Sequence, residues 1–594
     1  MRRIRQAVVL DGYVDEPTAL GVPPYISPYP RYVGGLLLSK GIPVRYVTAD
    51  TWRSDPAVRD VVASLAADDL LVVVAGLTVP GHYRGGTPLS LTELQTIVRT
   101  TSASSIVGGP IRHGYTLTGG TAALPWFPGP ARHHHAPGAP YRQIGPDETD
   151  RELRSDPPAL SPALLAPDSL DDFVDAWLED AFAPPVPADP YTAIGPRSVA
   201  GATLVTQHPD FPHVIVEIET ARGCERSVHC SFCTEGLAGP ATFRSESDIL
   251  AEISALYACG IRHFRLGKQP NLFAWPGRRS PSGESVPSPA HIASLYRSIR
   301  SVAPDLLTLH LDNVNPGFIA RFPEECGDIA ATVASLNTPG DVAALGLETA
   351  DPAVLAANSL KATTAQTLEA IRILNRAGAR RSGPSLPHLL PGINLLHGLP
   401  GETAATYERN FAFLSEVAAE GLLLRRINVR QVMAFPDTPL HRLTGGAPPK
   451  INKLRFQKWK QRIQEEIERP MLRRVAPVGT VLPNLVTEFH DGDVTFGRQL
   501  ASYPLLVGLP MRLSLRLVLD VVVVDHGFRS VTALPYPIEI NSLPEKALAA
   551  LPGIGKKRAA RLVAARPFST VSEVLAAMDE PAVLAPLTGL LRLP

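Results

Sequence analysis

Short apolar runs alternate with longer segments of helical periodicity along most of the chain. Within the first 115 residues, Gly or Pro bounds four such runs: AVVL at 7–10, PVRYVT at 43–48, LLVVVAGL at 70–77 and SIVGG at 105–109. Continuous apolar runs separated by helix-length segments are typical of parallel strands that are buried on both faces. The pattern therefore predicts an α/β layer over residues 1–116, which we describe as a Rossmann-like domain.

A second series of apolar runs begins near residue 213. The runs are HVIVEIE (213–219), HFRLG (263–267), LTLHLDN (307–313), AALGLE (343–348), GINLLHG (392–398) and INVRQVM (427–433). Helices are predicted between them; in one, Thr363 and Gln366 have the spacing of a capping box and Gly378 marks the end. Six strand–helix units predict a partial (β/α)6 barrel of the TIM type over 201–445. Its ligands should gather at the carboxyl ends of the strands.

The segments around this barrel have other patterns. Residues 117–200 are rich in Pro, Ala and Gly and are predicted to be a connection or insertion, partly disordered, with one helix indicated at 169–182. Its run His133, His134 and His135 is more typical of a tolerated loop tract than of a metal site. Residues 446–476 are predicted to be a basic helical linker; a solvated helix face is favoured there over contact with nucleic acid.

Composition narrows the class of protein only moderately. Apolar residues make up 45% of the chain, as in globular proteins, and 57 basic residues balance 57 acidic ones, so net charge indicates no partner. The first apolar run is too short for a signal peptide, and Arg512, Arg516 and Asp520 interrupt the late apolar stretch 505–524. We therefore expect a cytoplasmic protein with no membrane association. Five cysteines are too few, and odd in number, for a disulfide scaffold.

Three of the five cysteines follow directly after the predicted strand 213–219. Cys224, Cys230 and Cys233 have the spacing C-x5-C-x2-C. Three thiolates can bind three irons of a [4Fe–4S] cubane and leave the fourth iron open to a small chelating ligand. The alternative is a structural zinc site completed by His229 or His213. The other two cysteines, Cys259 and Cys326, are predicted to be structural.

The cysteine motif resembles that of the radical S-adenosylmethionine (SAM) superfamily. Members usually carry C-x3-C-x2-C with an aromatic residue just before the last cysteine, and Phe232 occupies that position here. The first spacing is two residues longer in this chain. The resemblance implies a [4Fe–4S] cluster and SAM as cofactors, and reductive cleavage of SAM to a 5′-deoxyadenosyl radical. It also implies a low-potential electron donor of the ferredoxin or flavodoxin type.

Later strand ends extend this resemblance. It implies that Glu348, in Gly-Leu-Glu-Thr, approaches the ribose or methionyl part of SAM. The resemblance places Gly398, Gly401 and Glu402 near the adenine, together with Gln431 on the sixth strand. Further polar residues at strand ends should face a substrate or make structural hydrogen bonds; they are Lys268, Gln269, Asp312, Asn313, Asn315 and His397. None of them is identified as catalytic.

The N-terminal domain also has a counterpart in the superfamily. Many radical SAM enzymes carry a cobalamin-binding Rossmann-like domain before the barrel, and residues 1–116 resemble it in outline. The usual D-x-H-x-x-G signature is missing, since Asp11-Gly-Tyr-Val-Asp15 contains no histidine. Cobalamin would have to bind without its histidine ligand, and we do not expect it.

The C-terminal segments point to a polymeric substrate. Residues 477–540 predict a small β-barrel that resembles the TRAM type of RNA-modifying radical SAM enzymes. Residues 541–594 contain LPGIGKKRAARLV, which resembles the helix-hairpin-helix motif, where glycines expose backbone N–H groups to phosphate. The nucleic-acid-binding residues predicted from this motif are Gly553, Gly555, Lys556, Lys557, Arg558 and Arg561. The alternative is a hairpin used only for helix packing or protein contact.

Taken together, the modules resemble a group of radical SAM enzymes with a C-terminal helix-hairpin-helix motif, found mainly in archaea. The implied function is modification of a nucleic acid such as tRNA. One alternative keeps the radical chemistry and changes the substrate to a small molecule or protein. Another is a non-enzymatic zinc protein that binds nucleic acid. Methylthiolation is disfavoured, because the additional N-terminal cysteine trio of methylthiotransferases is absent.

Overall fold

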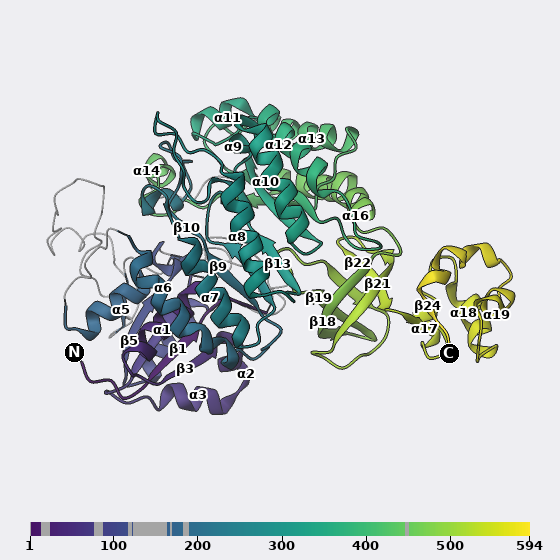
Figure 1. Ribbon diagram of the computed structural model, residues 1–594, viewed down its shortest axis with the longest axis horizontal. Coiled ribbons are helices and arrows are strands. Elements are labelled where there is room, and N and C mark those ends of the chain that lie inside the picture. The colour runs from purple at the N-terminus through teal and green to yellow at the C-terminus, as the bar shows by residue number, and fades with distance from the viewer. Residues whose placement is uncertain are drawn as a thin grey trace. The chain divides into compact units, whose positions relative to one another are not determined.

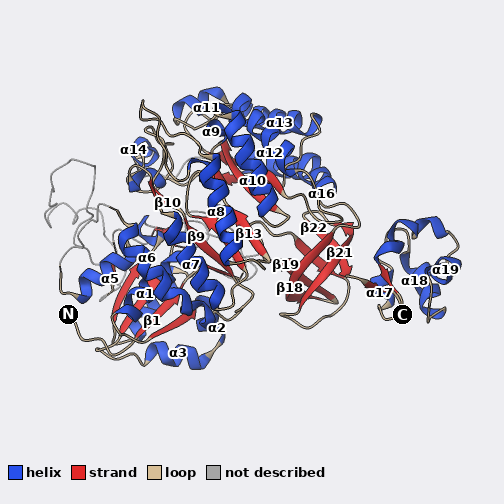
Figure 2. Cartoon of the chain, in the orientation of Figure 1, coloured by secondary structure: helices blue, strands red, loops and turns tan. Residues whose placement is uncertain are grey.

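The computed structural model describes residues 2–13, 24–76, 87–113, 115–116, 121–122, 163–166, 169–181, 189–445 and 451–594. The chain divides into two units. The first comprises Met1–Val286, Arg297–Leu306 and Met433–Pro449, and the second comprises Pro287–Tyr296, Leu307–Val432 and Lys450–Pro594. Figures 1 and 2 show their elements. Among the described helices, none combines the length and the apolar character needed to cross a bilayer.

The first unit begins with a parallel sheet of order β3-β1-β4-β5-β8. Its strands are β1 (Ala7–Asp11), β3 (Val44–Thr48), β4 (Leu70–Val74), β5 (Ser104–Gly108) and β8 (Leu164–Leu165). All residues of β1 and β4 are buried, as their continuous apolar runs predicted. Helices α1 (Pro28–Ser39) and α5 (Leu170–Leu178) share one hydrophobic core with the sheet.

The segment 117–200 is therefore more than a connection. Strand β8 extends the sheet beside β5, and α5 fills the core with Leu170, Val174 and Trp177. The helix predicted at 169–182 is present as α5, whereas the two-residue strand β8 leaves no periodicity in the sequence. The histidine run 133–135 lies outside the described residues.

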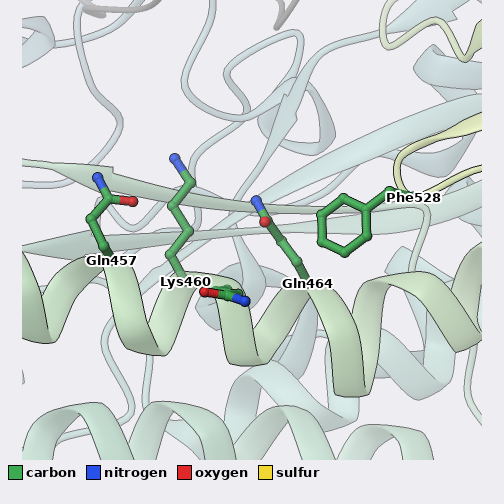
Figure 3. Close-up of a pocket in the computed structure, with 5 residues that line it drawn as sticks. Gln457, Lys460, Gln464 and Phe528 are labelled. Atoms are coloured by element: carbon green, nitrogen blue, oxygen red, sulfur yellow. The ribbon is translucent and has the colours of Figure 1, made fainter.

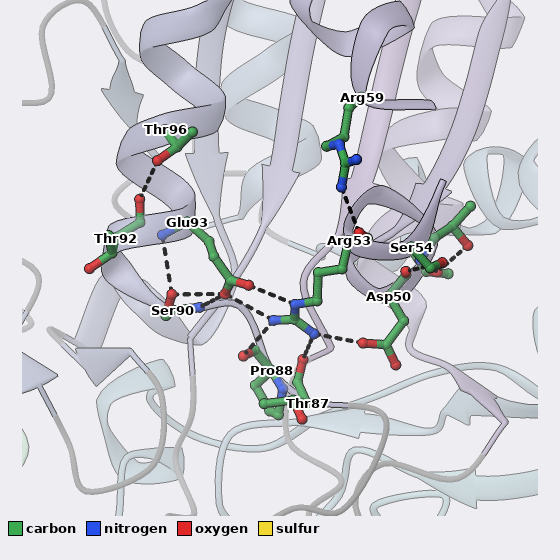
Figure 4. Close-up of polar contacts among 12 residues, drawn as sticks. Asp50, Arg53, Ser54, Arg59, Thr87, Pro88, Ser90, Thr92, Glu93 and Thr96 are labelled. Carbon is green, nitrogen blue, oxygen red and sulfur yellow. Dashed lines mark hydrogen bonds and ion pairs between the residues drawn. The ribbon is translucent and has the colours of Figure 1, made fainter. Parts of the chain in front are cut away.

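A network of ion pairs joins helices at one edge of this domain. Arg53 in α2 (Ala49–Ser54) donates to both carboxylate oxygens of Glu93, at 2.7 and 2.9 Å, and to Asp50 at 2.7 Å. Glu93 also completes a capping box with Ser90 at the start of α4 (Leu91–Thr100). Figure 4 shows these contacts. Burial alone would raise the pKa of Glu93, but the bonds from Arg53 and Ser90 lower it to about 2.

Three more parallel strands of the first unit form a second sheet. β9 (Ile215–Glu219) pairs with β12 (His263–Gly267) on one side and with β2 (Tyr25–Ile26) on the other. Buried ion pairs hold the surrounding helices. Arg31 of α1 and Arg244 both bond the Glu252 carboxylate of α7 (Glu246–Ala258). The N-terminal domain thus contributes both a strand and a buried cation to this layer.

The second unit contains the remaining strands of the series. β14 (Asn313–Val314), β15 (Asp341–Glu348), β16 (Leu389–His397) and β17 (Arg426–Gln431) form a parallel sheet in that order, and β13 (Thr308–Leu311) precedes them. Helices α9 (Pro316–Arg321), α10 (Pro323–Leu336), α11 (Pro352–Ala357), α12 (Thr364–Gly378) and α13 (Ala404–Ala419) lie between the strands in sequence. All six predicted strands are present, and Thr363 and Gln366 form the predicted capping box. Their closure into one partial barrel stays a prediction.

The rest of the second unit consists of a basic helical stretch, a closed β-barrel and three short C-terminal helices. The basic stretch forms α15 (Lys453–Ile463), a π-helical turn Gln464–Glu468 and α16 (Arg469–Val475). A closed five-stranded barrel follows, with β18 (Val481–Asp491), β19 (Val494–Gln499), β20 (Leu506–Leu509), β21 (Val518–His526) and β22 (Ser530–Pro535). The C-terminal helices are α17 (Glu545–Leu548), α18 (Gly555–Ala564) and α19 (Val571–Ala576).

Candidate functional site

The three clustered cysteines lie in a loop that follows the carboxyl end of β9. β10 (Ala221–Arg222) pairs with β11 (Thr242–Phe243) and brings the two ends of this loop together. Next to this ladder, the Cys224 N–H donates to the Gly239 carbonyl and the Ala241 N–H donates to the Cys224 carbonyl, both at 3.2 Å. Backbone hydrogen bonds therefore close the loop and fix Cys224 at its base.

Gly223 is required for this closure. Its φ of +78° is in the left-handed region, and a Cβ atom there would lie 2.5 Å from the Gly239 carbonyl oxygen. A side chain would push the two ends of the loop apart, so glycine is needed immediately before the first cysteine.

The three thiols are half-buried, and the loop gives one of them a positive neighbour. The Cys233 N–H donates to the Cys230 carbonyl at 3.2 Å, which turns the C-x2-C segment back on itself around Phe232. The Arg226 guanidinium Nη1 lies 3.2 Å from Cys230 Sγ. A cation at this distance favours the thiolate form, which is the form that binds metal.

His213 and His229, the histidines of the zinc alternative, lie in different surroundings. Within the described ranges, no group of three or more His, Cys, Asp or Glu side chains is arranged to hold one metal ion. His213 precedes β9 at the end opposite the cysteine loop, with its ring 6.4 Å from that of His263. The His229 ring lies against Gly236, since a Cβ atom on that glycine would be 2.5 Å from His229 Nδ1.

In the second unit, Glu348 ends β15 in a strained backbone conformation. Its φ is +67°, which costs a residue with a side chain roughly 1–2 kcal/mol. The side chain is buried, and this burial raises its pKa to about 7 although Lys361 and Arg430 act in the opposite direction. Strain combined with a desolvated charge is characteristic of functional sites.

Lys361 was not expected at this site. The Glu348 and Lys361 side chains meet over Gly346. A Cβ atom on this glycine would lie 2.4 Å from Glu348 Oε1 and 2.7 Å from Lys361 Nζ, so a larger residue would displace them. Lys361 lies beyond α11, and no strand-end pattern marks it. Arg430 could have been found from strand alternation, since it shares a face of β17 with Asn428.

The loop after β16 has an internal carboxylate. Gly398 (φ +92°) and Gly401 (φ +89°) shape the turn, and Glu402 Oε2 accepts hydrogen bonds from the Gly398 N–H at 3.0 Å and from His397 Nδ1 at 2.9 Å. The His397 ring also stacks on Tyr407 of α13, with centroids 4.1 Å apart. Glu402 therefore holds the loop in shape.

Of the two alternatives given for His397, a substrate-facing position and a structural hydrogen bond, the structure has the second. Because it lies between Glu402 and the aromatic rings of α13 and α15, its ring is buried with the helices. Gln431 occupies the register position opposite His397 on β17. Asn394 and Leu396, at the alternate positions of β16, are half-exposed.

Structural hydrogen bonds account for most other polar strand ends. Asn315 caps α9 by accepting from the Gly317 N–H at 3.0 Å. Contacts with nearby residues engage three more of the predicted residues: Gln269, Asp312 and Asn313. Lys268, which follows β12, differs from these residues. Like Glu348 at the end of β15, it has a left-handed backbone conformation, with a φ of +53°. Its Nζ lies 4.7 Å from the centre of the Tyr29 ring.

The two remaining cysteines have helical positions. Cys259 is the C-cap residue of α7, and burial raises the pKa of its thiol. Cys326 is fully buried in α10. Both positions agree with the structural roles predicted for them.

The C-terminal glycine turn divides the predicted basic residues into two groups. Gly553 and Gly555 have φ values of +71° and +58°, and α18 begins at the second glycine. Arg558 bonds Asp579 at 2.6 Å and Glu580 at 2.8 Å, and Arg561 lies 3.7 Å from Asp579. In the described part of the chain, Lys556 and Lys557 are exposed and have no acidic partner. The two lysines are therefore the cations left for a ligand.

Fold and site together define an α/β protein with a three-cysteine loop at a strand end and a closed β-barrel toward its C-terminus. No family model matches the chain. An uncharacterised protein of Archaeoglobus fulgidus is 39% identical over 536 residues, which span 90% of this chain and 91% of that protein. A second, from Methanocaldococcus jannaschii, is 37% identical over 89% of this chain and 93% of its own length. The chain belongs to the family of these two archaeal proteins.

More distant similarities involve enzymes. A tRNA-2-methylthio-N(6)-dimethylallyladenosine synthase of Sorangium cellulosum is 25% identical over 282 residues, 46% of this chain and 52% of that enzyme. Among solved structures, the radical SAM methyltransferase TsrM from Kitasatospora setae covers 82% of this chain and 79% of its own (16% identity, TM-score 0.46). The cobalamin-dependent radical SAM enzyme OxsB covers 77% and 66% (10% identity, TM-score 0.48).

Proposed function

We propose that this protein is a radical SAM enzyme whose [4Fe–4S] cluster is bound by Cys224, Cys230 and Cys233. The observation that carries the proposal is the loop after β9, which backbone hydrogen bonds close and in which three thiols are half-buried. With three protein ligands one iron would be left for SAM. When bound, the cluster would supply one electron from a ferredoxin- or flavodoxin-type donor to the sulfonium, so that the C5′–S bond breaks to give methionine and a 5′-deoxyadenosyl radical.

The residues of the loop prepare this site. Gly223 permits the close approach that seals the loop, and Arg226 offsets the negative charge that thiolates bring to it. Phe232, between the second and third cysteines, is half-buried in the loop. These are binding roles; the described residues identify no proton donor or acceptor for a substrate.

We assign binding of SAM to the strand ends of the second unit. Glu348 is a carboxylate held in a strained position beside Lys361, and it is suited to accept hydrogen bonds from ribose hydroxyls or the amino group. Gly398, Gly401 and Gln431 are assigned to the adenine. Glu402 acts on the same ligand indirectly, by holding the Gly398 N–H in place.

The proposed substrate is a nucleic acid, most simply a tRNA. Two observations support this class. The relative from Sorangium cellulosum is named as a tRNA-modifying synthase, and the glycine turn at Gly553 and Gly555 presents Lys556 and Lys557 without acidic partners in the described chain. The predicted helix-hairpin-helix role of Arg558 is reduced, because its guanidinium is already paired with Asp579 and Glu580.

The proposal is tested by SAM cleavage. The anaerobically purified chain, given dithionite and SAM, should release 5′-deoxyadenosine. Cys230→Ser should abolish this release, whereas the matched variant Cys259→Ser should retain it, because Cys259 lies outside the loop. Loss of activity in both variants, or in neither, would refute the assignment of the cluster to this loop.

A further inference from the structure

A small cavity lies in the second unit between helix α15 and the turn that joins β21 to β22. Its volume is about 360 Å³, and its lining consists of Gln457, Lys460, Gln461, Gln464 and Phe528. Figure 3 shows the α15 side chains along one side of the helix, with the Phe528 ring beside Gln464. Cavities of this volume are within the range that accommodates small organic ligands.

The helix presents these side chains as one row. Gln457, Lys460, Gln461 and Gln464 are spaced i, i+3, i+4 and i+7, so they share one face of α15. The last of them, Gln464, begins the π-helical turn Gln464–Glu468, a deviation that is frequent at functional sites. Among the described residues, the side-chain amides of Gln457 and Gln464 make no hydrogen bond within the chain, whereas the Gln461 amide donates to Glu465 at 2.9 Å. The row therefore offers amide donors and acceptors to a ligand.

Phe528 is an exposed aromatic ring on an anchored turn. The side chain retains 45% of its accessible surface. The turn itself is held, because His526 Nε2 lies 2.7 Å from the Ala476 carbonyl, the Gly527 N–H donates to Ser530, and Arg529 lies 3.8 Å from Glu468. A large apolar ring exposed at a fixed position, with polar side chains around it, is suited to stack on a flat ligand.

The electrostatic surroundings are positive. Burial, Arg529 and Arg430 lower the pKa of Lys460, while Glu468 acts in the opposite direction. Arg529 follows Phe528 in the chain and lies 3.8 Å from Glu468, a half-buried carboxylate in the π-helical turn. A phosphate beside the cavity would meet both cations.

We infer that this cavity binds an unpaired nucleobase of single-stranded RNA. Phe528 stacks on the base, the glutamine amides bond its Watson–Crick edge, and Lys460 with Arg529 faces the adjoining phosphate. Stacking on one aromatic side chain together with amide readout is the way proteins recognise unpaired bases. A protein hot spot would instead bring several apolar groups together, and here one ring stands among four polar side chains. The inference rests on the RNA substrate of the proposed function and not on its cluster.

The test measures binding of a fluorescent single-stranded RNA of about 12 nucleotides to the full chain by anisotropy. Phe528→Ala should weaken binding roughly 5- to 150-fold, the range expected from the loss of one stacked base, and Phe528→Tyr should retain it. The control is Leu515→Ala, which alters an equally exposed side chain (45%) of the same barrel and should leave affinity unchanged. The Phe528→Ala effect should shrink when a fully paired RNA duplex replaces the single strand.

Two results would overturn the inference. The first is equal affinity of the wild type and Phe528→Ala for the single strand, which would leave RNA as the substrate but place its bases elsewhere. The second is absence of RNA binding by the wild type, which would remove the nucleic-acid substrate as well. Neither result bears on SAM cleavage, so the cluster assignment is judged separately.

Discussion

Replacing Glu348 by glutamine removes a titratable group from a buried, strained position at the end of β15. Burial raises the pKa of this carboxyl from 4.5 to about 7, although Lys361 and Arg430 oppose the change. A raised pKa in an acid means that the folded state holds its proton more tightly than the unfolded chain does. Wild-type stability should therefore fall as pH rises from 4.5 through about 7, and stay at the lower level above that pH.

The size of the effect follows from the same shift. A rise of the pKa from 4.5 to about 7 corresponds to a loss of up to about 3 kcal/mol of folding free energy at pH 8. Glu348→Gln keeps the length of the side chain and the left-handed backbone but carries no charge. We expect the variant to be more stable than the wild type by up to about 3 kcal/mol at pH 8, and by very little at pH 4.5.

Urea unfolding followed by far-ultraviolet circular dichroism at the two pH values measures this difference. Glu408→Gln, an exposed change on α13, is the matched control and should show no pH-dependent gain. The same Glu348→Gln protein should bind SAM more weakly, because a residue retained at a cost to stability is expected to serve function. A gain equal at both pH values, or no gain at all, would refute the reasoning.

Three further predictions concern other parts of the chain. Arg53→Ala should lower the free energy of unfolding of the N-terminal domain by about 2 kcal/mol at pH 7, as measured by urea titration. The difference from the wild type should shrink as pH falls from 4.5 towards 2, because Glu93, with a pKa of about 2, becomes protonated there and its bond to Arg53 no longer contributes. Glu402→Ala should leave the loop after β16 without its acceptor and weaken SAM binding about tenfold in equilibrium dialysis; unchanged affinity would contradict the role given to that loop. The double variant Lys556→Ala, Lys557→Ala should reduce the slope of log affinity for RNA against log salt concentration by about two. Arg558→Ala should leave that slope almost unchanged and lower thermal stability, because Arg558 is paired with Asp579.

The elements of this fold could be predicted from sequence where burial on both faces makes the pattern simple. β1 and β4 consist of five buried residues each, and their apolar runs match those strands closely. Local chemistry was also predictable, since the capping box of Thr363 and Gln366 depends only on residues three apart. In contrast, the two-residue strand β2 pairs with β9 through Tyr25 and Ile215, which lie far apart in the chain and have no pattern in common.

The same distinction applies to the site. The loop after β9 could be recognised from sequence because its three cysteines lie within ten residues, and their role as cluster ligands stays a prediction. The direction of the His397 side chain was not predictable, because sequence does not show which face of the strand end is covered. That depends on the packing of α13, whose Tyr407 ring stacks on His397. Pairing of Arg558 with Asp579 and Glu580 likewise depends on a hairpin that brings distant residues together. Charge alone overstated how many basic residues remain for nucleic acid.

The central claim is that three thiolates bind a cubane and leave one iron open. Anaerobically purified protein should contain about four iron and about four sulfide per chain, and adding SAM to the reduced protein should change the electron paramagnetic resonance spectrum of the cluster. Stoichiometric zinc in place of iron would contradict the account. So would a cluster whose spectrum SAM leaves unchanged, because its fourth iron would then have a ligand from the protein.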